Sequence, residues 1–310
     1  MKKHLLALAA VACCSAAFAQ SSVTMYGVVD VSVGQTTGGK FGLNGGKSTG
    51  AVNQSYHTPT RIGLRGTEDL GNGMKANFNF ESGGIRMGDG GPNMDWSREA
   101  WVGLSGNFGS TRFGRTSSFG TQAHARYDFN GISTSSALDN AGISPVTWYG
   151  SSRRSVQLQY VTPKMSGFDA GISMVLAGNN NNQQSVSLRA NYDNGPLSVG
   201  YAAETKRTAV NRTAQAIAAS YDLGAAKVVG GYVVRETVAA GKGAYVGVIA
   251  PVGNFKVGGQ YARNTTTDIN ALELFGSYAL SKRTSLYLDY VKRNGNSKVY
   301  SYGLGVLHTF

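Results

Sequence analysis

The sequence predicts an all-β protein whose strands form a 16-stranded antiparallel transmembrane β-barrel. Three observations predict this fold: apolar and polar side chains alternate along many short stretches, short turns alternate with longer loops, and the last strand ends in an aromatic residue on an apolar face. The composition agrees, because Gly 43 and Tyr 16 with only Pro 6 in 310 residues suit many strands joined by tight connections. A hydrophobic content of 41% is low for a helical membrane protein.

The alternation is clearest in residues 74–81, where Met, Ala and two Phe side chains alternate with Lys, two Asn and Glu. Successive side chains of a strand point to opposite faces, so this strand has one apolar and one polar face. The same pattern recurs in residues 61–65, 153–160, 272–278 and 285–290. A soluble β-sandwich would show the same period, so the connections must distinguish the two folds.

Two kinds of connection alternate along the chain. Short stretches rich in turn-forming residues predict seven turns, near residues 68–73, 105–109, 163–167, 193–196, 222–224, 251–254 and 280–283. More polar and irregular segments predict eight loops, near residues 35–58, 86–95, 117–147, 178–185, 206–213, 237–242, 264–269 and 293–297. Seven turns and eight loops join 16 strands, and an even number of strands with short turns at one end is typical of outer-membrane barrels. Closure also leaves no unpaired strand edge in hydrocarbon.

The first 19 residues have the order of a secretory signal peptide: Lys2 and Lys3, an apolar run from Leu5 to Ala12, and a small-residue site ending at Ala19. The alternative, an anchoring helix, needs roughly 20 apolar residues, and the run is shorter. We therefore expect residues 1–19 to be removed and residues 20–310 to form a single barrel domain. Cleavage leaves 27 of the 29 Lys and Arg against 17 Asp and Glu, a formal charge of +10.

Both cysteines of the chain, Cys13 and Cys14, lie in the segment that we expect to be removed. The mature protein then has no disulfide and no cysteine-based metal site. We expect no metal and no cofactor.

The last strand carries Tyr302, Leu304, Val306, His308 and Phe310 on one face, and the chain stops at the aromatic residue. A terminal Phe preceded by apolar side chains at alternate positions resembles the signal read by the outer-membrane assembly machinery. These five residues are therefore the predicted assembly signal.

Several ordered motifs resemble the porins of Gram-negative β-proteobacteria, including anion-selective and neisserial-type members. They are Val23–Asp30, Arg61–Gly71, Arg98–Gly106, Phe113–Arg115, Tyr160–Pro163, Tyr192–Leu197 and Leu280–Thr284. The resemblance covers the whole mature chain and implies passive, largely unspecific diffusion of small hydrophilic solutes and ions through a water-filled channel. It also implies homotrimers and a long third loop folded into the lumen. The expected partners are outer-membrane lipid, lipopolysaccharide, the assembly machinery, and small hydrophilic solutes and anions.

The longest segment without a strand pattern is the candidate constriction loop, residues 117–145, because long irregular loops are usually functional or disordered. It contains Arg126, Asp128 and Asp139, with His124 of undetermined charge. It therefore carries fewer acids than the strongly acidic constriction loops of cation-preferring porins.

Side chains alternate between the two faces of a strand, and this parity places Arg61, Arg65 and Arg153 on the face toward the lumen. The same argument places Lys75 there. Guanidinium groups stay protonated at physiological pH, and rings of Arg and Lys are expected in an anion-preferring pore. The resemblance adds Arg98, whose parity is outward unless a bulge before Glu99 turns it inward.

Four acids are also inward by parity and oppose this positive field: Asp30, Glu81, Glu273 and Asp289. Their placement decides how strongly the pore prefers anions.

Other functions are less compatible with the sequence. The mature chain offers only His57, His124 and His308 as histidine bases, and none lies in a nucleophile motif, so no enzyme activity is expected. Lys and Arg are spread along the chain rather than clustered, which argues against nucleic-acid binding. A substrate-specific porin and a surface adhesin or receptor barrel remain alternatives.

Overall fold

The structure is a computed structural model of the chain. It describes residues 22–43, 56–83, 85, 95–131, 133–145, 153–176, 184–207, 212–235, 241–295 and 298–310. The expected signal peptide lies outside the described residues. No helix in the described ranges is long and apolar enough to cross a membrane.

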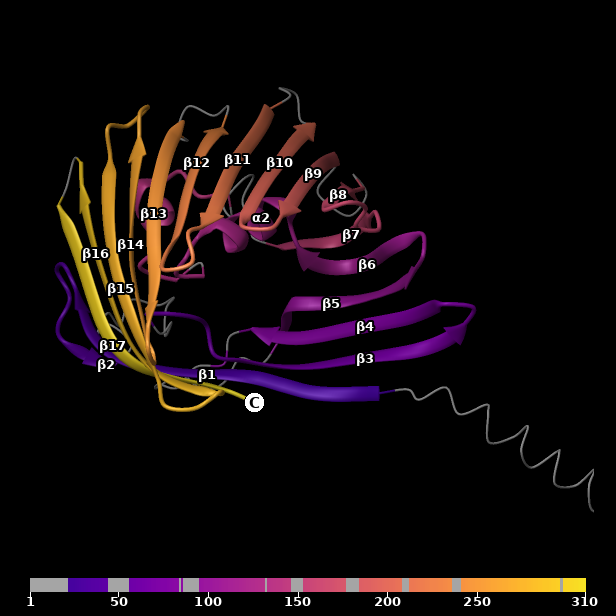
Figure 1. Cartoon of the computed structure of the whole chain (residues 1–310), viewed down its shortest axis with the longest axis horizontal. Helices are drawn as coiled ribbons and strands as arrows, with labels where there is room; N and C mark the ends of the chain where they lie inside the picture. Colours follow the sequence, from indigo (N-terminus) through magenta and orange to yellow (C-terminus); the bar gives the residue numbers. More distant parts are fainter. Residues whose placement is uncertain are drawn as a thin grey trace, which may run out of the picture.

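Sixteen long antiparallel strands, β1 and β3 to β17, form the wall of a closed barrel (Figure 1). The seventeenth, β2 (Gly42–Leu43), is a two-residue strand that pairs with β1. The wall strands are β1 (Ser22–Thr36), β3 (Arg61–Gly71), β4 (Met74–Gly83), β5 (Asp95–Gly106), β6 (Gly109–Ser117), β7 (Arg153–Val161), β8 (Phe168–Val175), β9 (Gln184–Asn194), β10 (Leu197–Arg207), β11 (Arg212–Asp222), β12 (Lys227–Arg235), β13 (Gly243–Val252), β14 (Phe255–Asn264), β15 (Asn270–Ala279), β16 (Thr284–Asn294) and β17 (Val299–Thr309). This confirms the predicted strand number and all-β class.

Strand β1 closes the barrel because it pairs with both of its neighbours. Its first half, Ser22–Val28, is antiparallel to β3, and its second half, Val28–Thr36, is antiparallel to β17. Strands β4 to β16 each pair with the strand before and the strand after them in the sequence, β3 pairs with β1 and β4, and β17 pairs with β16 and β1. The backbone hydrogen-bonding groups of the wall are therefore satisfied within the barrel, as a hydrocarbon environment requires.

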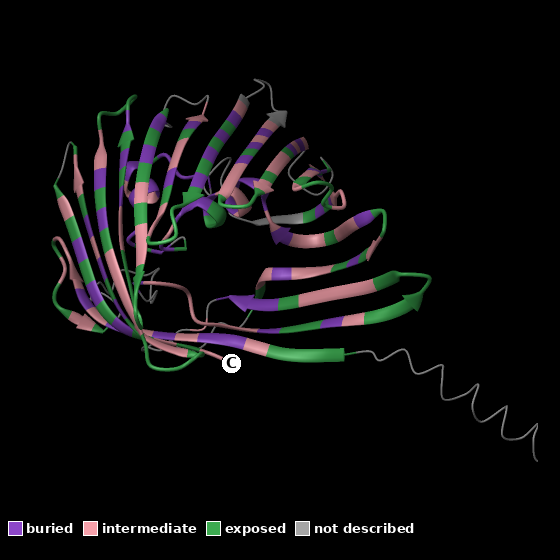
Figure 2. Ribbon diagram, viewed as in Figure 1, coloured by how far each residue is buried: buried purple, intermediate pink, exposed green. Residues whose placement is uncertain are grey.

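The two faces of the wall differ as the alternation predicts (Figure 2). In β16, Leu286 and Leu288 are exposed on the outside, whereas Tyr287 and Asp289, which alternate with them, are buried inside. Leucines, valines and aromatic residues of the same kind are exposed on all the other wall strands. An outward apolar band of this kind matches lipid rather than water.

The connections at one end of the barrel are tight turns. Between β3 and β4 the chain turns through Gly71, Asn72 and Gly73, all with positive φ. Only glycine adopts this conformation without cost, and asparagine tolerates it better than most other residues. The predicted turn at residues 68–73 is therefore confirmed, but shortened to its last three residues.

The segment between β6 and β7 contains two helices, α2 (Phe119–Tyr127) and α3 (Ala137–Ala141). The Ser118 side chain caps α2 by accepting from the Thr121 backbone N–H at 3.2 Å. Gly142 ends α3 in the left-handed conformation with φ 74°. Helix α2 contacts β9 to β12, and α3 contacts β14 to β16 (Figure 1).

Candidate functional site

Residues 118–131 and 133–144 pack against the inner face of the wall through a small apolar core. Tyr127, Leu138 and Ile143 are fully buried there. Their neighbours on the wall are mostly alanines with fully or nearly fully buried side chains: Ala202, Ala214, Ala216, Ala218, Ala262 and Ala271. Small side chains on the strands leave room for larger ones on the segment, so the two surfaces interdigitate.

Two glycines allow α2 to lie directly on the strands. A Cβ atom on Gly200 of β10 would lie 2.5 Å from Tyr127 Cε2, and one on Gly171 of β8 would lie 2.9 Å from Phe119 Cζ. The aromatic rings at the two ends of α2 therefore occupy the space of missing side chains. The position of the helix depends on these two contacts.

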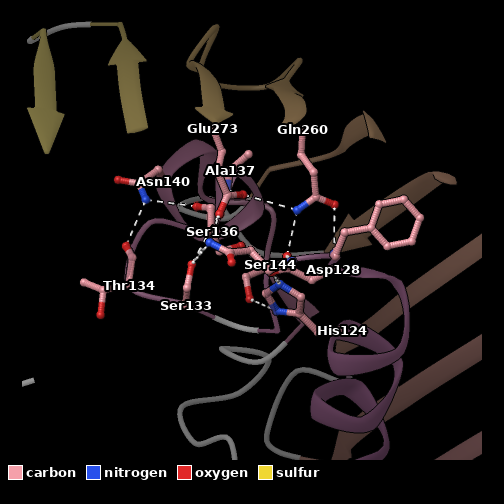
Figure 3. A network of polar contacts seen from close by, with 12 residues as sticks. His124, Asp128, Ser133, Thr134, Ser136, Ala137, Asn140, Ser144, Gln260 and Glu273 are labelled. Carbon is pink, nitrogen blue, oxygen red and sulfur yellow. Dashed lines mark hydrogen bonds and ion pairs between the residues drawn. The ribbon is translucent and has the colours of Figure 1, made fainter. Parts of the chain in front are cut away.

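A polar network joins the segment to β15, where Figure 3 shows Glu273, and to β16. The Asn130 side-chain amide donates to Glu273 Oε1 at 2.8 Å and to Asp289 Oδ1 at 3.0 Å. Glu273 Oε2 accepts from the Ala137 backbone N–H at 3.0 Å, where α3 begins. Two inward acids thus serve as acceptors for the segment, and neither is exposed to water in the lumen.

A second part of the network is centred on His124, which lies within the segment (Figure 3). Its Nε2 is 2.7 Å from Asp128 Oδ2, and its Nδ1 is 2.9 Å from Ser144 Oγ. Gln260 of β14 donates to the other Asp128 oxygen at 2.7 Å. Burial opposes ionisation of both groups, yet the ion pair prevails: it raises the pKa of His124 and lowers the pKa of Asp128. Burial raises the pKa of the nearby Asp139 carboxyl.

Residues 56–60 form a further contact with the segment that sequence reasoning missed. The Tyr56 carbonyl accepts from the Thr134 N–H at 3.1 Å, and the Tyr56 ring lies in the space left by Gly34 and Gly303. His57 lies 3.4 Å from Asp289 Oδ2. Burial lowers the pKa of His57, but the contact with Asp289 outweighs it, and the net direction is upward. The prediction assigned residues 35–58 to an outer loop, and only glycines at positions 34 and 303 hint at this packing.

Arg61 and Arg98 lie on either side of one carboxylate, Glu81. Arg98 forms an ion pair with Glu81 Oε1, and Arg61 Nε lies 3.7 Å from Oε2. The Tyr26 hydroxyl donates to the same carboxylate at 2.9 Å. Between Glu81 and Gly83 of β4 the pairing with β5 shifts register, directly before Glu99. This irregularity is the bulge that Arg98 needs to reach the inner face.

The other candidate cations lie elsewhere. Arg65 guanidinium stacks on the Tyr26 ring, 5.0 Å from its centroid. Lys75 is exposed next to the turn between β3 and β4. Arg126, on α2, forms an ion pair with Asp193 of β9 and donates to Ser198 Oγ at 3.0 Å. These residues do not form one ring with Arg61 and Arg98.

Arg153 is the first residue of β7, and its side chain lies outside the described residues. The register between β6 and β7 shifts by one residue: Gly114 pairs with Gln157, but Thr116 pairs with Arg154. Parity counted from Gln157 therefore does not extend to Arg153, and its place at the lumen stays a prediction.

The four inward acids are all compensated. Asp30, Glu273 and Asp289 are at most 2% exposed. Asp30 accepts from the Tyr287 hydroxyl at 2.6 Å and from the Thr58 N–H at 2.7 Å. Glu81 is held between two guanidinium groups. Little of the negative charge counted in the sequence therefore faces the lumen.

The residues of the predicted assembly signal share the outer face of β17, where Tyr302, Leu304 and Val306 are exposed. The backbone N–H and carbonyl of Phe310 both hydrogen bond to Gly27 of β1. Its ring contacts the Gly27 backbone at the position of the missing side chain. His308 Nδ1 lies 2.9 Å from Thr284 Oγ1 on the neighbouring strand.

A closed barrel with an apolar outside, a polar inside and a helical segment packed against part of its inner wall defines a membrane channel. The chain belongs to the Gram-negative porin family, whose pattern matches residues 6–298. It is therefore an outer-membrane porin, a non-enzymatic channel. In the part of the chain that the structure describes, no group of three or more His, Cys, Asp and Glu side chains could hold a metal ion.

Curated relatives agree with this assignment. Outer membrane porin protein 32 of Delftia acidovorans is 33% identical over 323 aligned residues, which cover 93% of this chain and 88% of the relative. The major outer membrane protein P.IB of Neisseria meningitidis is 32% identical over 215 aligned residues, which cover 67% of this chain and 60% of the relative.

Solved structures show the same fold. The anion-selective porin from Comamonas acidovorans is 26% identical and superimposes with a TM-score of 0.77 over 94% of this chain and 100% of that one. OmpT of Vibrio cholerae reaches a TM-score of 0.68 at 14% identity, over 94% and 98% of the two chains. The resemblance inferred from the sequence motifs is thereby confirmed.

Proposed function

We propose that this porin mediates passive, largely unspecific diffusion of small hydrophilic solutes and ions, with a preference for anions. The observation that carries the anion preference is the unequal exposure of charges on the inner face. The acids Asp30, Glu273 and Asp289 are buried, whereas the side chains of Arg61 and Arg98 are 21% and 17% exposed. In this cluster two guanidinium groups flank the single carboxylate of Glu81.

Fixed positive charge in a narrow channel with low-dielectric walls focuses the electrostatic potential, which concentrates anions and repels cations. The similarity to a porin described as anion-selective supports the same direction. A specific sugar channel would instead need a track of aromatic residues along the lumen. We therefore assign unspecific diffusion to this chain rather than recognition of one solute.

Residues 117–145 narrow the channel in this proposal. Their contacts with β8 to β12 and β14 to β16 support it, because a segment attached on the inner face reduces the open cross-section. Deletion of most of these residues should raise single-channel conductance. An unchanged conductance would show that the segment does not limit the flow of ions.

The mature protein begins at residue 20 and assembles as a homotrimer in the outer membrane, where it contacts lipid and lipopolysaccharide. The trimer form of OmpT supports this assembly by analogy of fold. Crosslinking of the protein in outer-membrane vesicles, followed by mass analysis, tests both the subunit number and the processed N-terminus.

Reversal potentials in a salt gradient across a planar bilayer test the charge preference. We expect the Arg61→Gln and Arg98→Gln double variant to shift toward cations, and Glu81→Gln to shift toward anions. Arg263→Gln is the matched control, because Arg263 is exposed and pairs with Asp268 outside this cluster. Equal reversal potentials for all four proteins would remove the cluster from ion selection, and the absence of any steady current would favour a plugged receptor barrel.

A further inference from the structure

A cavity of 280 Å³ lies inside the barrel, between the turn-side halves of β13 to β17 and the packed segment. The segment lines this cavity with Phe129, Asn130 and Gly131, and His57 adds a further side chain. A second cavity, of 390 Å³, reaches the turns that follow β13 and β15. The two cavities adjoin, because they share four lining residues: Lys256, Ser277, Ser285 and Leu307. The first cavity therefore opens toward the turn side of the channel.

Part of the wall of the first cavity is apolar, although the inside of a channel barrel is normally polar. Four apolar side chains with partial exposure line it: Phe129, Ile249, Phe275 and Leu307. The Phe275 ring lies in the space of a missing side chain, since a Cβ atom on Gly258 would lie 2.5 Å from its Cζ. A concave apolar surface with a few polar groups is the usual form of a small-molecule site. The wall thus indicates a ligand with an apolar part.

One carboxylate oxygen of the cavity lacks a hydrogen-bond donor. Asp289 lines the cavity and is 1% exposed, and its Oδ1 accepts from the Asn130 amide at 3.0 Å. Its Oδ2 has no hydrogen-bond partner among the described residues, and His57 Nδ1 lies 3.4 Å from it. A buried acceptor without a donor destabilises the protein, and a charged one more so. An ammonium group in the cavity would supply the donors that this oxygen lacks.

Lys256 supplies the opposite charge on the turn side of Asp289. It lines both cavities and is exposed, and no carboxylate of the described residues lies within ion-pair distance of it. Lys256 pairs with Ser277, and Ser277 pairs with Tyr287, two residues from Asp289. Two strand spacings across the wall and two residues along it place the backbones of Lys256 and Asp289 about 12 Å apart. Their side chains extend into this gap, which leaves room for a small molecule that carries both charges.

We propose that this cavity is a transient binding site for zwitterionic amino acids with an apolar side chain. The ammonium group of the amino acid donates to Asp289 Oδ2, its carboxylate pairs with Lys256, and its side chain packs against the apolar wall. A simple cation is repelled by Lys256 and a simple anion by Asp289, so a solute with both charges is favoured over either. The site goes beyond unspecific diffusion, because it selects a class of solutes. It does not depend on the proposed anion preference, since a zwitterion has no net charge.

Block of the single-channel current by leucine tests the site. Leucine has no net charge at pH 7, so it carries no current of its own and lowers the current only by occupying the channel. Added on the turn side of wild-type channels in potassium chloride, leucine should lower the current at concentrations where glycine and 4-methylpentanoate do not. Glycine lacks the apolar side chain, and 4-methylpentanoate lacks the ammonium group. Equal effects of the three solutes, or no effect of leucine, would overturn the site.

Two variants assign the block to this cavity. Asp289→Asn keeps an acceptor for Asn130 but removes the charge, and Lys256→Gln removes the opposite charge. Each should raise the half-blocking concentration of leucine at least fivefold, and the double variant should raise it further. Arg263→Gln is the control, because Arg263 is exposed and pairs with Asp268, and leucine should block it as it blocks wild type. An unchanged half-blocking concentration in the double variant would also overturn the site.

Variants of Lys256 keep the experiment decisive if Asp289→Asn fails to fold. Lys256 is exposed, so its substitution leaves the buried network intact. Lys256→Arg keeps the charge and should keep the block by leucine, whereas Lys256→Gln should weaken it. Equal block of these two variants would count against the site. Failure of the site and failure of the anion preference are distinguishable, because the wild-type reversal potential in potassium chloride alone reports only the second.

Discussion

Asn130 and Glu273 are 143 positions apart in the sequence, and their side chains hydrogen bond at 2.8 Å across the inside of the barrel. The same amide group also donates to Asp289 Oδ1. One neutral side chain thus bridges two buried acidic side chains on neighbouring strands. The attachment of the segment to β15 and β16 depends on this amide.

Asn130→Ala should loosen that attachment. The substitution removes two hydrogen bonds to carboxylates, each worth roughly 1.5–3 kcal/mol, and leaves the two acids facing each other. Single-channel recordings should show more frequent transitions between conductance levels than in wild type. Asn254→Ala, in the exposed turn between β13 and β14, is the matched control. If the Asn130→Ala channel changed conductance level no more often than wild type, other contacts would be sufficient to hold the segment.

Gly200→Ala should displace helix α2, because the new Cβ would lie 2.5 Å from the Tyr127 ring. Overpacking of this size costs about 1–3 kcal/mol. The midpoint of thermal unfolding in detergent should fall. Gly230→Ala on β12 is the control, because its new Cβ would lie 3.8 Å from the nearest atom, the Tyr245 carbonyl oxygen. This substitution should leave the unfolding midpoint unchanged. If both substitutions lowered the unfolding midpoint equally, the loss of stability would come from the change in strand propensity and not from the contact with Tyr127.

The ion pair of His124 and Asp128 predicts a pH dependence of channel noise. The pKa of His124 is raised above 6.5, so its contribution to stability is fully present below pH 6.5 and is lost as the pH rises through the folded-state pKa. The pKa of Asp128 is lowered below 3.8, so its contribution is present above pH 3.8 and is lost on further acidification. Current noise should therefore increase as the pH rises above 6.5 and through the folded-state pKa of His124.

His124→Gln isolates this effect, because glutamine keeps hydrogen bonding but does not titrate. Asp139, whose pKa is raised by burial, remains in the variant, so any pH dependence of noise that it causes is present in both proteins. The variant should be noisier than wild type at pH 6 and should change less on alkalinisation. An identical pH profile in both proteins would exclude His124 as the titrating group.

Phe310→Ala should lower the yield of folded barrel. The Phe310 ring lies against the backbone of Gly27, and its main chain extends the pairing of β17 with β1. The heat-modifiable fraction on gel electrophoresis of outer membranes measures this yield. Phe255→Ala, another exposed aromatic on the outer face, is the control. Equal yields for the two variants would contradict a special role of the last residue.

The strands could be predicted because lipid and water impose opposite polarity on alternate side chains, as in residues 285–290. Parity failed where the pairing shifts. The bulge before Glu99 brings Arg98 to the inner face, and the shift opposite Gly114 removes the parity argument for Arg153. Extra residues in one strand change the face of side chains within or beyond the irregularity, and the pattern of one strand does not reveal how two strands pair.

The packing inside the barrel could be predicted only in part. Buried acids were counted as lumen charges, because parity gives a side chain's face but not what covers it. Alanine at alternate positions 214, 216 and 218 of β11 was a usable signal, since a water-lined face has no need for small apolar residues. The contact partners of residues 56–60 depend on folding of distant segments and leave almost no local trace.

The packed segment occupies one side of the barrel, against β8 to β12 and β14 to β16, and this makes the route for solutes eccentric. Bulkier side chains on β3 to β6 would then reduce the flow of solutes without disturbing folding. Bulkier side chains on the alanine-lined strands would disturb folding first. Permeability thus depends on one side of the barrel wall and folding on the opposite side. Related chains can change the side chains of one side without altering the property that depends on the other.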